Sequence, residues 1–142
     1  MATRRDELAA LQAVLAGEHA AVYGYGVAGA RLRGRPRERA TAAYTAHRVR
    51  RDDLMALVRA RGGQPVPAEA TYELPGPVTT AADAVALATL LEERLAAVYA
   101  DAVAELDGDL RRLAVDGLRD CAVRAARLRG GSVAFPGLPE RA

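Results

Sequence analysis

The segment QPVPAEATYELPGPVT, Gln64–Thr79, is the longest part of this chain without a helical pattern, and it limits how the helices on either side can be connected. Its sixteen residues reach about 50 Å when extended, whereas a helix of 26 residues is about 39 Å long. The segment can therefore run the full length of a helical bundle, although a loop folded at one end is the alternative. The apolar residues Tyr72 and Leu74 can attach it to the bundle, which favours the crossing path.

Long helical patterns account for most of the remaining chain. Apolar residues recur three and four positions apart, as at Leu8, Leu11 and Leu15, which is the spacing of a helix packed on one face. Thr80 stands three positions before an acidic residue, which is typical of the start of a helix. The patterns predict helices over residues of about 3–33, 36–62, 80–106 and 109–129, with a crossover over 63–79 and a tail over 130–142.

The connections between the predicted helices define the fold class. The first and second helices are joined by only a few residues, as are the third and fourth, so each pair must be antiparallel neighbours. One long proline-rich crossover between the second and third helices is the connectivity of ferritin-like bundles. We therefore predict an all-α protein, a ferritin-like four-helix bundle that forms a single domain over residues 1–142. We expect the tail, which contains Phe135, to pack over one end of the bundle.

The composition excludes several classes of protein. Hydrophobic residues make up 51% of the chain and charged residues 27%, which is too apolar for a disordered chain. The single cysteine, Cys121, excludes a disulfide framework and a thiolate metal cluster. No apolar run has the length of a membrane span, and the first residues lack the apolar stretch of a signal peptide. We expect a cytoplasmic protein that does not bind a membrane. The chain contains arginine but no lysine, which indicates a high-GC bacterial genome.

Polar residues interrupt the apolar faces of the predicted helices near their middles. Because a buried charge is costly unless it is paired, residues at one level of a bundle would have to satisfy one another. We predict a metal-free buried polar cluster of salt bridges and hydrogen bonds, and we expect no cofactor. Its predicted members are Glu18, His47, Arg51, Glu92, Asp120 and Arg124.

A metal site is the main alternative interpretation of these residues. A di-iron bundle needs a lone Glu on each of two helices and Glu-x-x-His on the other two. The chain has only two histidines, and Tyr44 occupies the position three residues before His47, so a di-iron centre cannot be assembled. A single metal ion held by Glu18, His47 and Glu92 is still possible. It would make the protein a mononuclear metal-binding protein or a metal-dependent oxidoreductase.

A basic stretch follows the first predicted helix. Arginine occupies every second position at Arg31, Arg33, Arg35, Arg37 and Arg39. This end of the bundle could bind phosphates or another acidic partner, which gives anion or nucleic-acid binding as a second alternative function. No aromatic residue interleaves with these arginines, so we do not expect nucleic-acid binding by base stacking.

Several stretches together resemble a known family. They are GEHAAVYGYG (17–26), HRVRRDDL (47–54), PAEATYELP (67–75), LLEERLAAVYADAV (90–103) and FPGLP (135–139). The combination covers almost the whole chain and resembles an uncharacterised ferritin-like domain of unknown function from high-GC bacteria. The resemblance implies a ferritin-like bundle without an established activity. It carries over motif positions without an assigned role at Glu18, His19, His47, Arg51, Asp52 and Glu92.

The main functional hypothesis follows from the incomplete metal constellation. We favour a non-enzymatic structural or interaction module over an enzyme. The third predicted helix carries more leucines than one stripe requires, including Leu87, Leu90 and Leu95, which indicates a second buried surface and a homodimer. We interpret Tyr25 and Tyr99 as core residues whose hydroxyl groups need partners.

Overall fold

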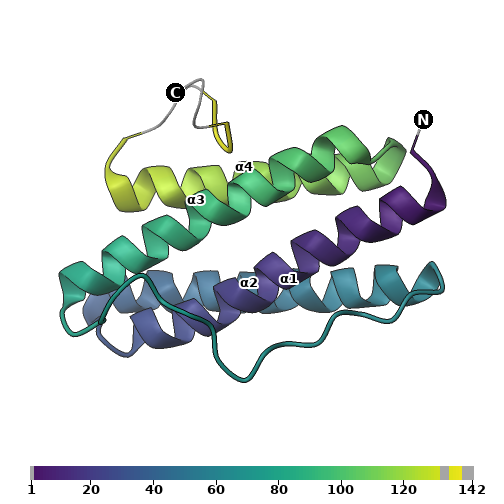
Figure 1. The fold of residues 1–142 in the computed structure, drawn as a ribbon. Helices are drawn as coiled ribbons and strands as arrows, with labels where there is room; N and C mark the ends of the chain where they lie inside the picture. The colour runs from purple at the N-terminus through teal and green to yellow at the C-terminus, as the bar shows by residue number, and fades with distance from the viewer. Residues whose placement is uncertain (1, 132–134, 139–142) are drawn as a thin grey trace.

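The computed structural model describes residues 2–131 and 135–138 of the chain. It consists of four long helices in the order α1, α2, α3 and α4, and the described residues contain no strand (Figure 1). The predicted all-α four-helix bundle is therefore confirmed. The helices span Arg4–Gly29, Gly34–Ala60, Ala81–Glu105 and Gly108–Arg129.

Local sequence signals account for most helix ends. α1 and α3 each begin with a capping box, in which Thr3 and Thr80 accept the backbone N–H of the Asp three residues later. α1 ends at Gly29, a few residues earlier than predicted, and Leu32 then packs into the core from the short turn. After α2, Gly62 adopts a φ of +79°, which only glycine takes without strain.

The central pair of the bundle is α1 and α3. α1 packs against both α2 and α3, and α4 packs against α3. Glycines allow two of these close approaches, because a Cβ atom at Gly117 on α4 would lie 2.5 Å from Cε1 of Tyr99 on α3. On α1, a Cβ at Gly24 would likewise collide with Leu91 of α3. Residues near the middle of the helices therefore come within side-chain reach of one another.

The segment between α2 and α3 runs back along α1 and α2, so that α2 and α3 point in the same direction (Figure 1). α1 holds this crossover in place. Val66 N–H donates to Oε1 of Gln12 at 2.8 Å, and Nε2 of His19 donates to the Val66 carbonyl at 2.9 Å. Further along, Tyr72 packs on Tyr23 with the ring centroids 5.5 Å apart. The crossover is thus attached to α1 at several points along its path.

The described part of the tail lies on the side of the bundle. Gly137, with φ +78°, lies against α3, where a Cβ atom would be 2.7 Å from the carbonyl oxygen of Ala96. The expectation that the tail packs over a bundle end is therefore wrong for residues 135–138. The small side chains of Ala96 and Ala100 leave room on α3 that a glycine backbone can fill. Residues 132–134 and 139–142 lie outside the described part of the chain.

In the described part of the chain, none of the helices combines the length and the apolar character needed to cross a bilayer.

Candidate functional site

Three of the predicted polar residues come together in the middle of the bundle. Glu18 on α1, His47 on α2 and Glu92 on α3 are 0%, 1% and 0% exposed. Each occupies an inward position of its helix, where the spacing of the sequence would otherwise place an apolar residue. The tertiary structure encloses two carboxylates and an imidazole completely.

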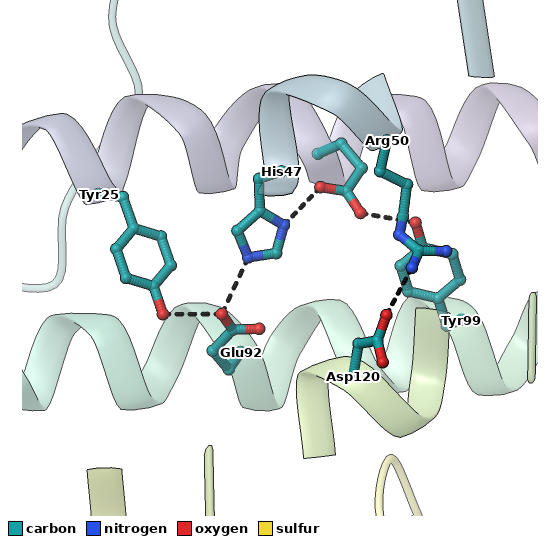
Figure 2. A network of polar contacts seen from close by, with 7 residues as sticks. Tyr25, His47, Arg50, Glu92, Tyr99 and Asp120 are labelled. Carbon is teal, nitrogen blue, oxygen red and sulfur yellow. Dashed lines mark hydrogen bonds and ion pairs between the residues drawn. The ribbon is translucent and has the colours of Figure 1, made fainter. Parts of the chain in front are cut away.

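His47 lies between the two glutamates. Its Nδ1 is 2.6 Å from Oε2 of Glu18, and its Nε2 is 2.9 Å from Oε1 of Glu92 (Figure 2). Both ring nitrogens face carboxylates, so both donate and the ring is an imidazolium. Burial alone would lower the pKa of His47, but the hydrogen bonds and charges of Glu18 and Glu92 outweigh it and raise the pKa to about 9. His47 is therefore charged at neutral pH.

Two tyrosines extend this arrangement at both ends. The hydroxyl of Tyr99 donates to Oε1 of Glu18 at 2.6 Å, and the hydroxyl of Tyr25 donates to Oε1 of Glu92 at 2.7 Å (Figure 2). Burial, followed by the charge of the adjacent carboxylate, raises the pKa of both hydroxyls, so they stay protonated. We call this continuous chain of hydrogen bonds the polar core. Its members, in order, are Tyr25, Glu92, His47, Glu18 and Tyr99.

An ion pair between α2 and α4 lies next to the polar core. Arg50 places Nη2 2.6 Å from Oδ2 of Asp120, and its guanidinium lies 5.9 Å from the centre of the Tyr99 ring (Figure 2). Sequence reasoning missed Arg50 and placed Arg51 in the cluster. Arg51 instead pairs with the neighbouring Asp52 at 2.9 Å and lies outside the polar core. Arg50 and Arg51 both lie about one turn from His47. Arg50, three positions after His47, is the one that faces α4.

The other predicted member, Arg124, is half-buried on α4 and forms no ion pair with the residues that the structure describes. Its charge acts at longer range, where it opposes the upward pKa shifts of Tyr25 and Cys121. Cys121 is buried, and burial followed by the charge of Glu92 raises the pKa of its thiol. The thiol therefore stays protonated at neutral pH.

The two carboxylates of the polar core differ in how their oxygens are hydrogen-bonded. Oε2 of Glu92 is a buried side-chain atom without a hydrogen bond to any described residue. The two hydrogen bonds that Glu92 accepts both end on its Oε1. Both carboxylate oxygens of Glu18 therefore accept hydrogen bonds, whereas at Glu92 only Oε1 accepts them.

The polar core does not have the arrangement of a metal centre. Glu18 and Glu92 lie on opposite sides of the His47 ring, and each carboxylate bonds to one ring nitrogen. Within the described ranges, no group of three His, Cys, Asp or Glu residues is placed to hold a metal ion. In the described part of the chain the donor set therefore lacks the arrangement of a di-iron centre, and Glu18, His47 and Glu92 bond to one another.

The basic stretch spreads over the turn after α1 and the start of α2. Arg31 donates through Nε to the carbonyl of Val78 at 3.1 Å. Arg33, Arg35, Arg37 and Arg39 are exposed, and the last three lie within α2. Alternate residues of a helix point about 200° apart, so Arg37 points away from Arg35 and Arg39, which share one face.

Comparison with known proteins supports this description of the fold. One similar solved structure is that of a conserved hypothetical protein, rv2844, from Mycobacterium tuberculosis. It has 34% sequence identity and a TM-score of 0.85, and the match covers 94% of this chain and 100% of that chain. No curated protein matches the sequence. Residues 10–140 match the model of a domain of unknown function, DUF4439, and the chain therefore belongs to the DUF4439 family.

Proposed function

We propose that this chain is a non-enzymatic ferritin-like module that acts by binding a partner. In this proposal, the polar core stabilises the bundle at the level where ferritin-like enzymes carry a di-iron centre. The observation that carries the proposal is the position of His47, whose two nitrogens are both engaged by carboxylates at 2.6 and 2.9 Å. The resemblance of the sequence to a ferritin-like domain also supports it.

A structural role is further supported by the enclosure of the polar core. Two surface grooves of the described chain are lined by other residues, and Glu18, His47 and Glu92 are 0%, 1% and 0% exposed. A substrate would have to displace packed helices to reach them. Cys121, which is buried and unpaired, is compatible with the reducing cytoplasm that we propose as the location.

The metal alternative can be tested directly. Protein purified without chelators should contain metal at well below one ion per chain, and added Fe²⁺ or Zn²⁺ should leave the thermal midpoint unchanged. If one ion per chain is retained in the wild type and lost in Glu18→Gln, the polar core is a metal centre and the proposal fails.

For the partner, we propose a second copy of the chain that packs on the outer face of α3 and α4. A groove of about 760 Å³ lies there, lined mainly by apolar residues. Val115, Val123 and Phe135 in this groove are 44%, 42% and 48% exposed. Leu90, expected from the sequence to belong to a second surface, lines this groove, whereas Leu87 and Leu95 are buried within the single chain.

The oligomeric state tests this interface. We expect analytical ultracentrifugation to show a dimer for the wild type and a monomer for Val123→Arg, because an arginine in the groove must be desolvated. Val49→Arg is the matched control, since Val49 is 57% exposed on α2 and lies outside the groove. A wild type that stays monomeric at high concentration, or a control that dissociates equally, would contradict the interface.

A further inference from the structure

A second groove, of about 670 Å³, lies between α2 and the crossover. We propose that it binds a small amphiphilic organic anion, with a carboxylate or phosphate head held by Arg51 and Arg59. The volume falls within the range of small-molecule sites, about 300–1,000 Å³. This site is separate from the polar core and from the outer face of α3 and α4.

The wall that the crossover contributes is held in a defined position. Gln12 uses both ends of its amide on this segment: Nε2 donates to the Gln64 carbonyl and Oε1 accepts from Val66 N–H. His19 donates from Nε2 to the Val66 carbonyl. Because these bonds fix the backbone of residues 64–66, the groove is formed before a ligand arrives, which reduces the entropic cost of binding.

His19 also leaves one group for a ligand. The residue is only 6% exposed, yet it lines the groove. With Nε2 engaged by the crossover, Nδ1 makes no hydrogen bond to the residues that the structure describes. This nitrogen can accept a hydrogen bond from a ligand hydroxyl. His19 therefore adds one acceptor to the lining of the groove.

The groove carries two arginines and one carboxylate, that of Asp52, so its charged side chains sum to a positive charge. Arg51 and Arg59 both line it, eight positions apart on α2, which corresponds to about 12 Å along the helix axis. The guanidinium of Arg59 makes no ion pair with any described residue. Arg51 pairs only with Asp52, whose side chain is 63% exposed, and such a surface pair is weak enough for a ligand anion to displace. Guanidinium groups bind carboxylates and phosphates through paired hydrogen bonds.

The rest of the lining selects a ligand with an apolar part. Met55 from α2 and Pro65, Val66 and Pro67 from the crossover present apolar atoms between the charged groups. A bare inorganic anion would leave this surface in contact with water. An anion with an apolar body would bury it, and the hydrophobic contribution grows with the area removed from water.

Binding can be measured by NMR titration with octanoate and octyl phosphate as probes, and with octanol and inorganic phosphate for comparison. We expect both amphiphilic anions to shift the amide signals of Gly63, Gln64 and Val66. The two comparison compounds should bind at least about tenfold more weakly, because each lacks either the charge or the apolar body. Octanol or inorganic phosphate binding as tightly as octyl phosphate would overturn the proposal.

Because Arg59 is exposed, replacing it tests the site without destabilising the fold. Arg59→Gln should weaken octyl phosphate binding about tenfold, the effect of losing a charge-assisted hydrogen bond. Arg127→Gln is the matched control, because Arg127 is an exposed arginine on α4 outside the groove. Equal affinities for the two variants, or signal changes confined to other helices, would contradict the assignment. The ratio of octanoate to octyl phosphate affinity then identifies the preferred head group.

Discussion

Nε2 of His47 lies 2.9 Å from Oε1 of Glu92, the same oxygen that accepts the Tyr25 hydroxyl at 2.7 Å. Glu92 therefore receives both of its hydrogen bonds on one oxygen, while Glu18 receives one on each. The hydrogen bonding of the polar core is asymmetric for this reason, although the order of its residue types, Tyr–Glu–His–Glu–Tyr, is symmetric. The difference leads to distinct expectations for its two halves.

Replacing Glu18 should strongly destabilise the protein. Glu18→Ala removes the acceptor for both His47 and Tyr99 and leaves a buried charge and a buried hydroxyl without partners. We expect a loss of roughly 3–5 kcal/mol in the free energy of unfolding, measured by urea denaturation. Glu93→Ala is the control, since Glu93 forms an exposed ion pair with Arg129, and it should cost about 1 kcal/mol or less. A thermal midpoint of Glu18→Ala within a degree of wild type would contradict the buried position of Glu18.

Stability should fall as the pH rises above neutrality. The pKa of His47 in the folded protein is raised to about 9 from an ordinary value of 6.5. When folding raises a pKa, the folded state is fully stabilised at any pH below the pKa of the unfolded protein. This stabilisation is lost as the pH rises through the pKa of the folded protein. Tyr25 and Tyr99 do not titrate in this range because their pKa values are also raised. The free energy of unfolding should therefore decrease between about pH 6.5 and 9.

The control for this pH dependence is His47→Gln, which removes the titrating group. We expect the variant to be less stable at pH 6.5 and to show a flatter profile between pH 6.5 and 9. An NMR titration should find the His47 ring protonated at pH 7.5. A neutral ring at that pH, or an identical slope in the variant, would be incompatible with an imidazolium between two carboxylates.

The two tyrosines should differ in their contribution to stability. Tyr99→Phe leaves Oε1 of Glu18 without a donor, whereas after Tyr25→Phe the corresponding oxygen of Glu92 still accepts from His47. Leaving a buried acceptor unsatisfied costs about 1–3 kcal/mol, so we expect Tyr99→Phe to be the more destabilising change. Parallel urea denaturation of the two variants measures the difference. The reverse order would mean that Glu92 depends on Tyr25 more than the hydrogen bonds indicate.

A pair of glycine substitutions tests the packing of α3 against α4. Gly117→Ala places a Cβ 2.5 Å from the Tyr99 ring, and the required shift should cost about 1–3 kcal/mol. Gly26→Ala on α1 is the control because nothing lies within 4 Å of its Cβ. Alanine there should be neutral or should stabilise the helix by up to about 1 kcal/mol. Thermal unfolding of both variants distinguishes a packing effect from a change in helix propensity, and similar midpoints would contradict close contact at Gly117.

Most of the fold could be predicted because its signals are local or depend on chain length. Helix periodicity and the threonine–aspartate starts place the helices, and the extended length of residues 64–79 exceeds that of a helix. The burial of Glu18, His47 and Glu92 could be anticipated for a similar reason. A charged residue on the apolar face of a helix is carried into the core with its apolar neighbours, whatever the identity of the opposing helix.

Partner choice, in contrast, depends on how helices far apart in sequence turn toward one another. Arg50 and Arg51 both lie about one turn from His47, and only the rotation of α2 relative to α4 selects Arg50 for Asp120. The polar core likewise needs Tyr25 of α1 to meet Glu92 of α3 and Tyr99 of α3 to meet Glu18 of α1. Helical periodicity specifies the inward face of each helix to within about one residue. A hydrogen bond requires its atoms to be placed to within a few tenths of an ångström. Only the packing of the helices provides that precision.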